Sequence, residues 1–297
     1  MTVNPLYLVD ASIYIFRYWF SIPDNFTSRD GMPVNAVYGY TNFLLDLLER
    51  NPEFISFAFD ESLTTCFRND IYPDYKANRD LPDETLEFQL ARCQEITALL
   101  GFHCVCMKDY EADDIIGTLM ARLARKRPVI IVTRDKDLGQ LLREQDRLWD
   151  YAANQYAGPR EVAGKFGVAA HQLADFLALA GDTVDNIPGA PGIGARTAAS
   201  LLGHFGSLDA LLKEKDRIHE LPLRGAARIH GIIERHEADI RLDRRITGIK
   251  CDIPMSVKLQ DLKPAPGNPD ALAAFCDEME FGGRIRHRIE ALSQKHA

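Results

Sequence analysis

Three short apolar runs that each lead into an aspartate constrain the fold of this chain more than any other feature. They cover residues 6–9, 54–59 and 129–132; Asp10 and Asp60 follow at once, and Asp135 follows after two residues. Continuous apolar runs of this length are typical of strands buried on both faces of a parallel sheet. Helical periodicity fills the intervals, over residues 34–48, 86–100 and 111–123. The sequence therefore predicts an α/β fold with a central, mostly parallel sheet flanked by helices.

The strand signal fades after about residue 158, and helical patterns replace it. They cover residues 171–179, 196–202, 208–212 and 224–240; a proline-containing extended stretch follows at 251–269, then a short helix at 272–281 and a basic tail. We therefore expect an α/β core over residues 1–170, a helical subdomain over 171–250, and an extension over 251–297 that packs back on the core.

Carboxylates gather where the predicted strands end and at two later positions. Nine of them stand out: Asp10, Asp60, Glu111, Asp113, Asp114, Asp135, Asp137, Asp182 and Asp185. Each acid alone is equally explained as a helix cap, and the group at 111–114 as compensation of a helix dipole. Ligands of parallel sheets bind beyond the carboxyl ends of the strands, and nine acids there would repel one another. Hard divalent ions resolve the repulsion, so the pattern predicts two or more Mg²⁺ or Mn²⁺ ions.

Two further segments suggest contact with phosphate, although each has a plainer explanation. Gly192 and Gly194 lie in a turn before a helix, where backbone N–H groups can approach an anion, but an ordinary helix–helix turn has the same appearance. Residues 66–90 form an unusual segment whose first part, through Glu84, is polar and contains two prolines. They are either a solvated connection or a lid that presents Arg68, Lys76 and Arg79 to phosphate.

The charge of the whole chain argues, at first sight, against a nucleic-acid partner. Of 297 residues, 43 are acidic and 35 are Lys or Arg, which gives a net charge of −8. Without the nine proposed ligands, however, the acidic and basic residues nearly balance, and the region from Gly189 to Lys250 is mildly basic. The six cysteines lack zinc-ligand spacing, which indicates reduced thiols. No secretory signal or membrane-length apolar segment is evident, so we expect a cytoplasmic protein without a membrane partner.

Five motifs together resemble the 5′-nuclease family, which includes the 5′→3′ exonuclease domain of bacterial DNA polymerase I, phage 5′ exonucleases and flap endonucleases. They are FAFD at 57–60, FRNDIYPDYKANR at 67–79, YEADD at 110–114, TRDKDLGQLL at 133–142 and GDTVDNIPGAPGIGARTA at 181–198. The resemblance runs from residue 6 to about residue 281. It implies a PIN-like nuclease core with two metal sites, a helical arch at about residues 64–90, and a helix–hairpin–helix element within 171–250.

The resemblance also implies roles for individual residues. All nine acids become metal ligands, with Asp10, Asp135, Lys76 and Arg79 as catalytic residues. The implied DNA-binding set is Arg68, Tyr72, Lys76, Arg79, Gly192, Ile193, Gly194, Arg196 and Thr197. In relatives the hairpin can also hold a K⁺ ion through its backbone carbonyls.

The chain departs from the family pattern at two points. Bacterial relatives usually have glycine after the first aspartate, whereas here Ala11 and Ser12 follow Asp10. The predicted arch is acidic, which puts in doubt how strongly it grips phosphate. Asp182 and Asp185 are both retained, which favours a working enzyme, and the absence of room for a polymerase domain after residue 297 predicts a standalone nuclease.

The predicted function is that of a structure-specific, divalent-metal-dependent 5′→3′ exonuclease and flap endonuclease. Its partner would be DNA with 5′ flaps, ends or junctions, and we expect a monomer. Two alternatives remain open: a metal-dependent ribonuclease that acts on RNA–DNA hybrids, and a DNA-binding relative without catalytic activity. The complete acid set speaks against the second alternative.

Overall fold

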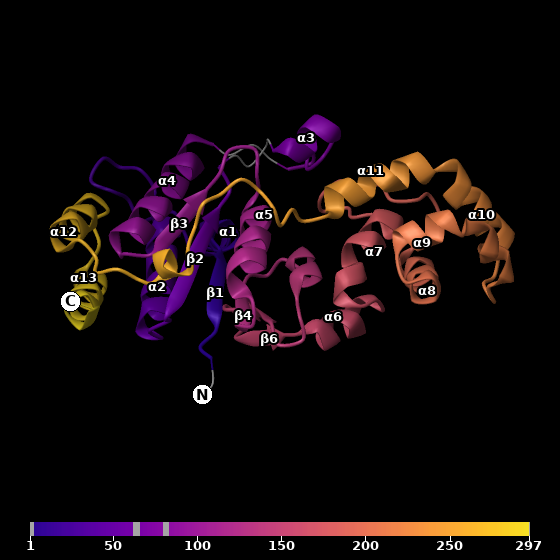
Figure 1. Ribbon diagram of the computed structural model, residues 1–297. Helices are drawn as coiled ribbons and strands as arrows, with labels where there is room; N and C mark the ends of the chain where they lie inside the picture. The colour runs from indigo at the N-terminus through magenta and orange to yellow at the C-terminus, as the bar shows by residue number, and fades with distance from the viewer. Residues whose placement is uncertain (1–2, 62–65, 80–82, 297) are drawn as a thin grey trace.

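A six-stranded sheet forms the centre of the computed structural model, which describes residues 3–61, 66–79 and 83–296 (Figure 1). Its strands are β1 (Leu6–Asp10), β2 (Phe54–Phe59), β3 (His103–Cys106), β4 (Val129–Val132), β5 (Arg147–Asp150) and β6 (Gln155–Ala157). They lie in the order β3-β2-β1-β4-β5-β6, and β6 alone is antiparallel to its neighbour. The predicted α/β fold with a mostly parallel sheet is confirmed.

The three apolar runs of the sequence are the three adjacent central strands. Leu8 of β1 pairs with Ser56 of β2 on one side and with Ile131 of β4 on the other. This parallel register brings the carboxyl ends of β1, β2 and β4 to one edge, so the acids that follow them share that edge.

Alternating side chains of the strands feed two separate hydrophobic cores, one on each face of the sheet. Val9 and Phe57 pack with helices α1 (Ala11–Ser21), α2 (Asn35–Glu49) and α4 (Glu84–Leu99). Leu8 and Ala58 pack on the opposite face with α5 (Ala112–Leu119), which continues as a π-helical turn over Met120–Ala124. The second core extends without interruption into the helical part of the chain.

The helical part consists of α6 (Pro159–Phe166), α7 (Leu173–Ala180), α8 (Ala195–Phe205), α9 (Leu208–Lys213), α10 (Ala226–Arg235) and α11 (Glu237–Thr247). It lies at one end of the sheet, with α11 returning toward α5 (Figure 1). The pattern predicted as one helix over 224–240 is two helices. The break is at His236, whose backbone leaves helical geometry with φ −106° and ψ 18°.

The C-terminal residues cover the face of the sheet that carries α1, α2 and α4. Helix α12 (Pro269–Glu278) contributes Leu272 and Phe275 to that core. The basic tail, which the sequence analysis left without structure, is helix α13 (Gly283–His296), and it lies against α2. Its buried residues Ile285, Ile289 and Leu292 recur at helical spacing, which explains why the tail folds despite its charge.

The predicted arch over residues 64–90 is described in part. Residues 64, 65 and 80–82 lie outside the described residues. The described portion begins with a short helix, α3 (Phe67–Ile71), continues through turns to Arg79, and resumes with α4 from Glu84. None of the described helices has both the length and the apolar character that crossing a membrane requires.

Candidate active site

The ends of the central strands place the first acids of the candidate site. Asp10 is the last residue of β1, and its carboxylate accepts hydrogen bonds from the Ile13 N–H at 3.4 Å and the Thr133 hydroxyl at 2.9 Å. Thr133 follows β4 and in turn accepts the N–H of Asp135 at 2.9 Å. One threonine therefore fixes two acids from neighbouring strands, a role that the sequence analysis missed.

Asp60 connects β2 to the beginning of α5. Its carboxylate accepts the N–H of Ala112, the first residue of α5, at 2.8 Å. Ser12 accepts the backbone N–H of Asp60 at 3.2 Å. The Ala11–Ser12 pair that departs from the family pattern is therefore accommodated here by packing Ala11 in the core and using Ser12 as a hydrogen-bond acceptor.

Five of the predicted ligands form a cluster of negative charge: Asp10, Asp60, Asp113, Asp135 and Asp137. Burial is the first cause that raises the pKa of each of these carboxyls, and neighbouring acids raise it further. The pKa of Asp10 rises to about 7 and that of Asp137 to about 8. One oxygen of Asp137 is buried without a hydrogen-bond partner among the described residues. None of the five forms an ion pair with a basic side chain of the described residues, although the charges of Lys76 and Lys136 partly oppose the rise in pKa.

The other four predicted ligands each have a basic partner. Arg68 lies 2.7 Å from oxygens of both Glu111 and Asp114, Lys136 lies 2.6 Å from Asp182, and Arg79 lies 2.8 Å from Asp185. Lys76 also pairs with Glu111. Although burial opposes it, the charges of Lys76 and Arg68 lower the pKa of Glu111 to about 2. The structure thus divides the nine acids into a paired group and an uncompensated group.

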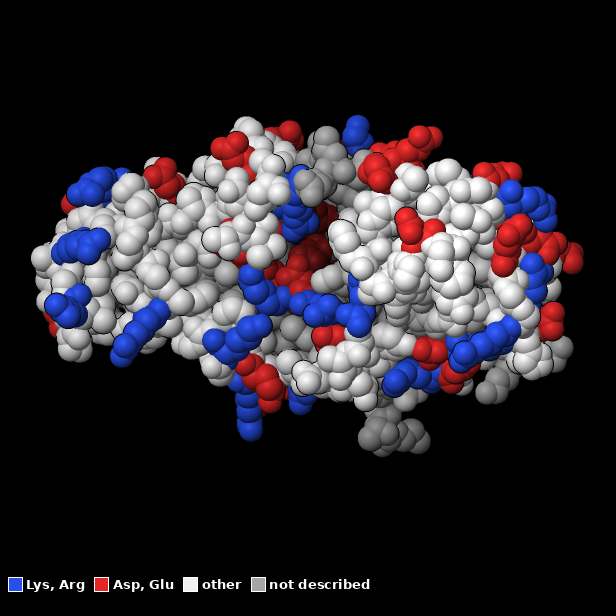
Figure 2. All heavy atoms as spheres, turned by 180° about the vertical axis from the view of Figure 1, so that it is seen from behind, with Lys and Arg blue, Asp and Glu red and all other residues white. Residues whose placement is uncertain are grey.

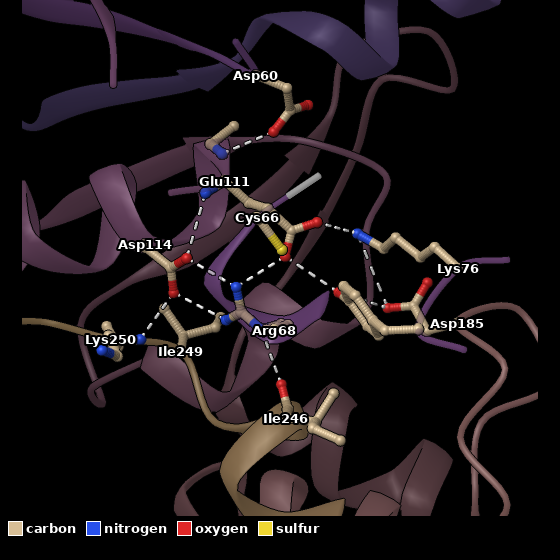
Figure 3. A network of polar contacts seen from close by, with 12 residues as sticks. Asp60, Cys66, Arg68, Lys76, Glu111, Asp114, Asp185, Ile246, Ile249 and Lys250 are labelled. Carbon is tan, nitrogen blue, oxygen red and sulfur yellow. Dashed lines mark hydrogen bonds and ion pairs between the residues drawn. The ribbon is translucent and has the colours of Figure 1, made fainter. Parts of the chain in front are cut away.

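Arg68 is placed differently from the expectation that it faces DNA. Its guanidinium is 3% exposed and points into the protein, between Glu111, Asp114 and the end of α11 (Figure 3). Asp114 is fully buried, and besides Arg68 it accepts the N–H of Lys250 at 2.8 Å and that of Glu111 at 3.3 Å. Since protein donors occupy both oxygens of Asp114, this acid is held in an internal ion pair, and neither residue faces solvent.

Lys76 and Arg79 turn from the arch segment toward the acids. Lys76 has a φ of +55°, and its N–H donates to the carbonyl of Asp185 at 3.1 Å. Its ammonium group pairs with Glu111 and lies 4.0 Å from Asp185 (Figure 3). Tyr75, which the sequence analysis did not select although it precedes Lys76 in the motif, donates its hydroxyl to Glu111 at 3.0 Å. The described part of the arch segment therefore contacts the acidic site directly.

The remaining predicted DNA-binding residues lie in the turn before α8, in the first turn of α8 and, for Tyr72, in the arch segment. Gly192 and Gly194 are exposed in the turn between α7 and α8, and Gly192 has a φ of +88° that side chains rarely tolerate. Arg196 and Thr197 lie in the first turn of α8. Ile193 is 3% exposed and belongs to the core, so it offers the turn its backbone only. Tyr72 is partly buried against Tyr75, Ile187 and Ile246.

A hollow exposes this site to solvent. Figure 2 shows acidic side chains on its floor and basic side chains along its rim. Two cavities of about 370 and 420 Å³ adjoin it; the first includes Asp135 and Lys136, and the second Lys136, Lys165 and Asp182. A larger cavity of about 710 Å³ between β5 and α6 contains none of the nine acids. The volume of a cavity therefore does not identify the site, whereas the acidic side chains around it do.

The donor set suits hard divalent cations, although the geometry is not preformed. Among the described residues, no three His, Cys, Asp or Glu side chains are already arranged around a metal position. All nine candidates carry carboxylate oxygens, although protein donors occupy both oxygens of Asp114, and the uncompensated cluster would attract positive charge. Because Lys76 and Lys136 make ion pairs with acids of this site, a divalent ion bound here would compete with these two ammonium groups.

Sequence comparisons identify relatives over nearly the whole chain. A family model described as the N-terminal resolvase-like domain of 5′-3′ exonuclease matches residues 5–167, and one described as its C-terminal SAM fold matches residues 168–270. The 5′-3′ exonuclease of Buchnera aphidicola is 31% identical over 262 residues, which are 87% of this chain and 91% of that protein. DNA polymerase I of Pseudomonas aeruginosa is 37% identical over 284 residues, which are 95% of this chain and 31% of the polymerase. The chain thus spans about a third of the length of that relative.

Solved structures share the fold at lower identity. The zinc-bound T5 5′-exonuclease superposes with a TM-score of 0.68 and 19% identity, and the match covers 98% of this chain and 100% of that chain. Flap endonuclease-1 of Methanococcus jannaschii has a TM-score of 0.61 and 16% identity, covering 99% and 92%. The family models cover most of the residues that build the acidic site and the helical part. This chain belongs to the 5′-3′ exonuclease family of nucleases.

Proposed function

We propose that the chain is a divalent-metal-dependent phosphodiesterase that hydrolyses DNA near 5′ ends and at single-strand/duplex junctions. The observation that carries the proposal is the uncompensated cluster of Asp10, Asp60, Asp113, Asp135 and Asp137 at the carboxyl edge of the sheet. In a chain of this family, such a cluster is best explained as the binding site of two Mg²⁺ or Mn²⁺ ions. A solved structure of the T5 D15 flap endonuclease is a pseudo-enzyme-product complex with DNA and metal ions, which supports the same assignment.

The ligands would come from the cluster together with Glu111, Asp182 and Asp185. Ions bound there would displace the side chains of Lys76, Lys136 and Arg79, whereas Arg68 would stay in place. When bound, the two ions supply the positive charge that stabilises the attacking and leaving oxygens of displacement at phosphorus. We assign Asp114 to support of the site, because protein donors occupy both its oxygens.

Lys76 and Arg79 would contact the scissile phosphate, because their ion pairs already hold them at the acidic site. Both pair with acids that the ions would engage, Glu111 and Asp185. With ions held by these acids, Lys76 and Arg79 would be available to a phosphate in the same place. They would then offset charge on the scissile group and orient it, which is the main protein contribution to such a reaction.

Duplex DNA would lie against the turn between α7 and α8. Gly192, Gly194, Arg196 and Thr197 present backbone N–H groups and a positive charge at the start of α8, a suitable arrangement for phosphate oxygens. We assign the proposed K⁺ to the carbonyls of this turn. We also propose a monomeric state and the division into residues 1–170, 171–250 and 251–297. The border of the two family matches at 167/168 supports the first boundary, whereas the second match runs past residue 250 to residue 270.

The test is cleavage of 5′-labelled substrates by the purified chain with Mg²⁺, with Mn²⁺ and with EDTA. The substrates are a 5′-flap duplex, a blunt duplex, a single strand and an RNA–DNA hybrid. We expect metal-dependent cleavage near the flap junction, its loss in Asp135→Ala, and normal activity in Asp270→Ala, an exposed acid on α12. Preferred cleavage of the hybrid would favour the ribonuclease alternative, and flap binding without cleavage in either metal would favour a non-catalytic relative.

A further inference from the structure

We propose that Arg68 is a positioning residue that sets the orientation of Glu111 at the metal site and links this acid to the helical part of the chain. The inference rests on the function proposed above. It assigns to Arg68 a role inside the protein instead of contact with DNA.

The guanidinium of Arg68 makes five hydrogen bonds, as many as it has N–H donors. Two go to Asp114 at 2.7 and 2.8 Å, and one goes to Glu111 at 2.7 Å. The other two go to the carbonyls of Ile246 at 2.9 Å and Gly248 at 3.1 Å. Every donor is committed, so the side chain has one orientation, and its 3% exposure leaves it no route to solvent.

This arrangement determines which oxygen of Glu111 faces the site. Arg68 and the Tyr75 hydroxyl both hold Oε2 of Glu111. The remaining oxygen, Oε1, points to the ammonium group of Lys76 (Figure 3). Asp114 balances the charge of Arg68 from the other side, so Glu111 keeps one oxygen free of the arginine. Partners of this kind orient a metal-binding carboxylate without touching the metal.

The same residue closes the end of α11. The last carbonyls of a helix have no partner within the helix. Here the N–H of Gly248 donates a hydrogen bond to the carbonyl of Arg244. The side chains of Arg68 and Gln140 donate to the carbonyls of Ile246 and Thr247, the second at 3.0 Å. Near the middle of α11, Asp243 accepts the N–H of Gly189 at 3.0 Å, beside the turn proposed to bind duplex DNA. Helix α11 therefore connects that turn to Arg68, and Arg68 connects it to Glu111.

The test replaces Arg68 with lysine, which keeps the charge and removes the planar fork. The matched control is Arg143→Lys, since Arg143 also pairs with an aspartate, Asp146, and with two backbone carbonyls, but contacts none of the nine acids. Mn²⁺ affinity is measured by calorimetry on protein whose folding is verified by circular dichroism, and kcat and KM are measured on the flap duplex. Asp114→Asn, which keeps the shape but not the charge, is the second variant in case Arg68→Lys does not fold.

We expect Arg68→Lys and Asp114→Asn to weaken Mn²⁺ binding by ~10- to 100-fold, the range seen when partners of metal ligands are removed. Their kcat should fall more than their KM rises, whereas Arg143→Lys should lower the melting temperature and leave Mn²⁺ affinity unchanged. Wild-type Mn²⁺ affinity in folded Arg68→Lys, or in Asp114→Asn if the first variant does not fold, would overturn the inference and leave the proposed function intact. Failure of the wild-type chain to bind Mn²⁺ would overturn both.

Discussion

Adjacent acids of α5, Asp113 and Asp114, should respond to substitution with opposite changes in stability. Asp114 is fully buried and neutralises Arg68, so Asp114→Ala leaves a buried guanidinium with Glu111 as its one remaining carboxylate. Among the described residues Asp113 has no such partner: burial first, and then the charges of Asp135 and Asp10, raise its pKa well above the ordinary value. The carboxylate of Asp113 is therefore less favourable in the folded protein than in the unfolded one.

The size of the first effect follows from the broken ion pair. Removing one partner of a buried pair costs about 3–5 kcal/mol. For a chain of this length the entropy of unfolding is about 0.6 kcal/mol per kelvin, so Asp114→Ala should lower the melting temperature by about 5–8 °C. Asp113→Asn, which removes an uncompensated charge and keeps the shape, should instead raise the melting temperature of the metal-free protein.

The assay is thermal unfolding followed by circular dichroism at neutral pH, in EDTA and again with excess Mg²⁺. Wild type should gain stability from Mg²⁺, because ions bind the folded state, and Asp114→Ala should keep part of this gain, since it weakens the site only through the position of Glu111. Asp113→Asn should gain much less, since it has lost a ligand. A fall in the metal-free melting temperature of Asp113→Asn equal to that of Asp114→Ala would refute the division of the acids into paired and uncompensated groups.

Three further predictions concern other parts of the molecule. Lys76→Met should slow single-turnover flap cleavage by ~100- to 1,000-fold, the usual cost of losing one charge-stabilising donor, and a change of only a few-fold would count against a role at the phosphate. Gln89 is fully buried, and its side-chain oxygen accepts the N–H groups of Ala36 and Val37 at the start of α2. Gln89→Leu should lower the free energy of unfolding, measured in urea, by about 1–3 kcal/mol. An unchanged unfolding midpoint would contradict this prediction. Burial lowers the pKa of His103, although the charge of Asp261 opposes this shift. The contribution of His103 to stability should therefore be complete above the unfolded pKa of about 6.5 and decline as the pH falls below that value. His103→Gln should flatten this part of the curve of stability against pH, and an unchanged curve would argue against the prediction.

Local sequence patterns were sufficient to predict the central strands of the fold. The runs that became β1, β2 and β4 are apolar throughout because those strands are buried on both faces, and such runs are visible without any knowledge of distant residues. Strands β5 and β6 have four and three residues and lie at one side of the sheet. Their sequences have no comparable apolar run, and their place depends on the pairing of β5 with β4 and of β6 with β5.

The composition of the site was predictable, whereas its internal division was not. Acids at strand ends must share an edge once the sheet is parallel, so their grouping follows from the sequence. Which acids are neutralised depends on Arg68, which meets Glu111 and Asp114 across 43 and 46 residues of sequence. The basic residues of the arch segment looked equivalent in the sequence, yet Arg68 is 3% exposed and Arg79 is 43% exposed. Packing of α3 against the end of α11 determines this difference, and no local pattern encodes it.

The most direct test of the account is the dependence of the single-turnover flap-cleavage rate on Mg²⁺ concentration. If two ions bound by the carboxylate cluster carry the reaction, the rate should rise with a logarithmic slope of about two at low Mg²⁺ and then saturate. Asp135→Asn should need far more Mg²⁺ or show no activity. A rate that is independent of Mg²⁺, or a slope of about one throughout together with normal activity in Asp135→Asn, would contradict the central claim.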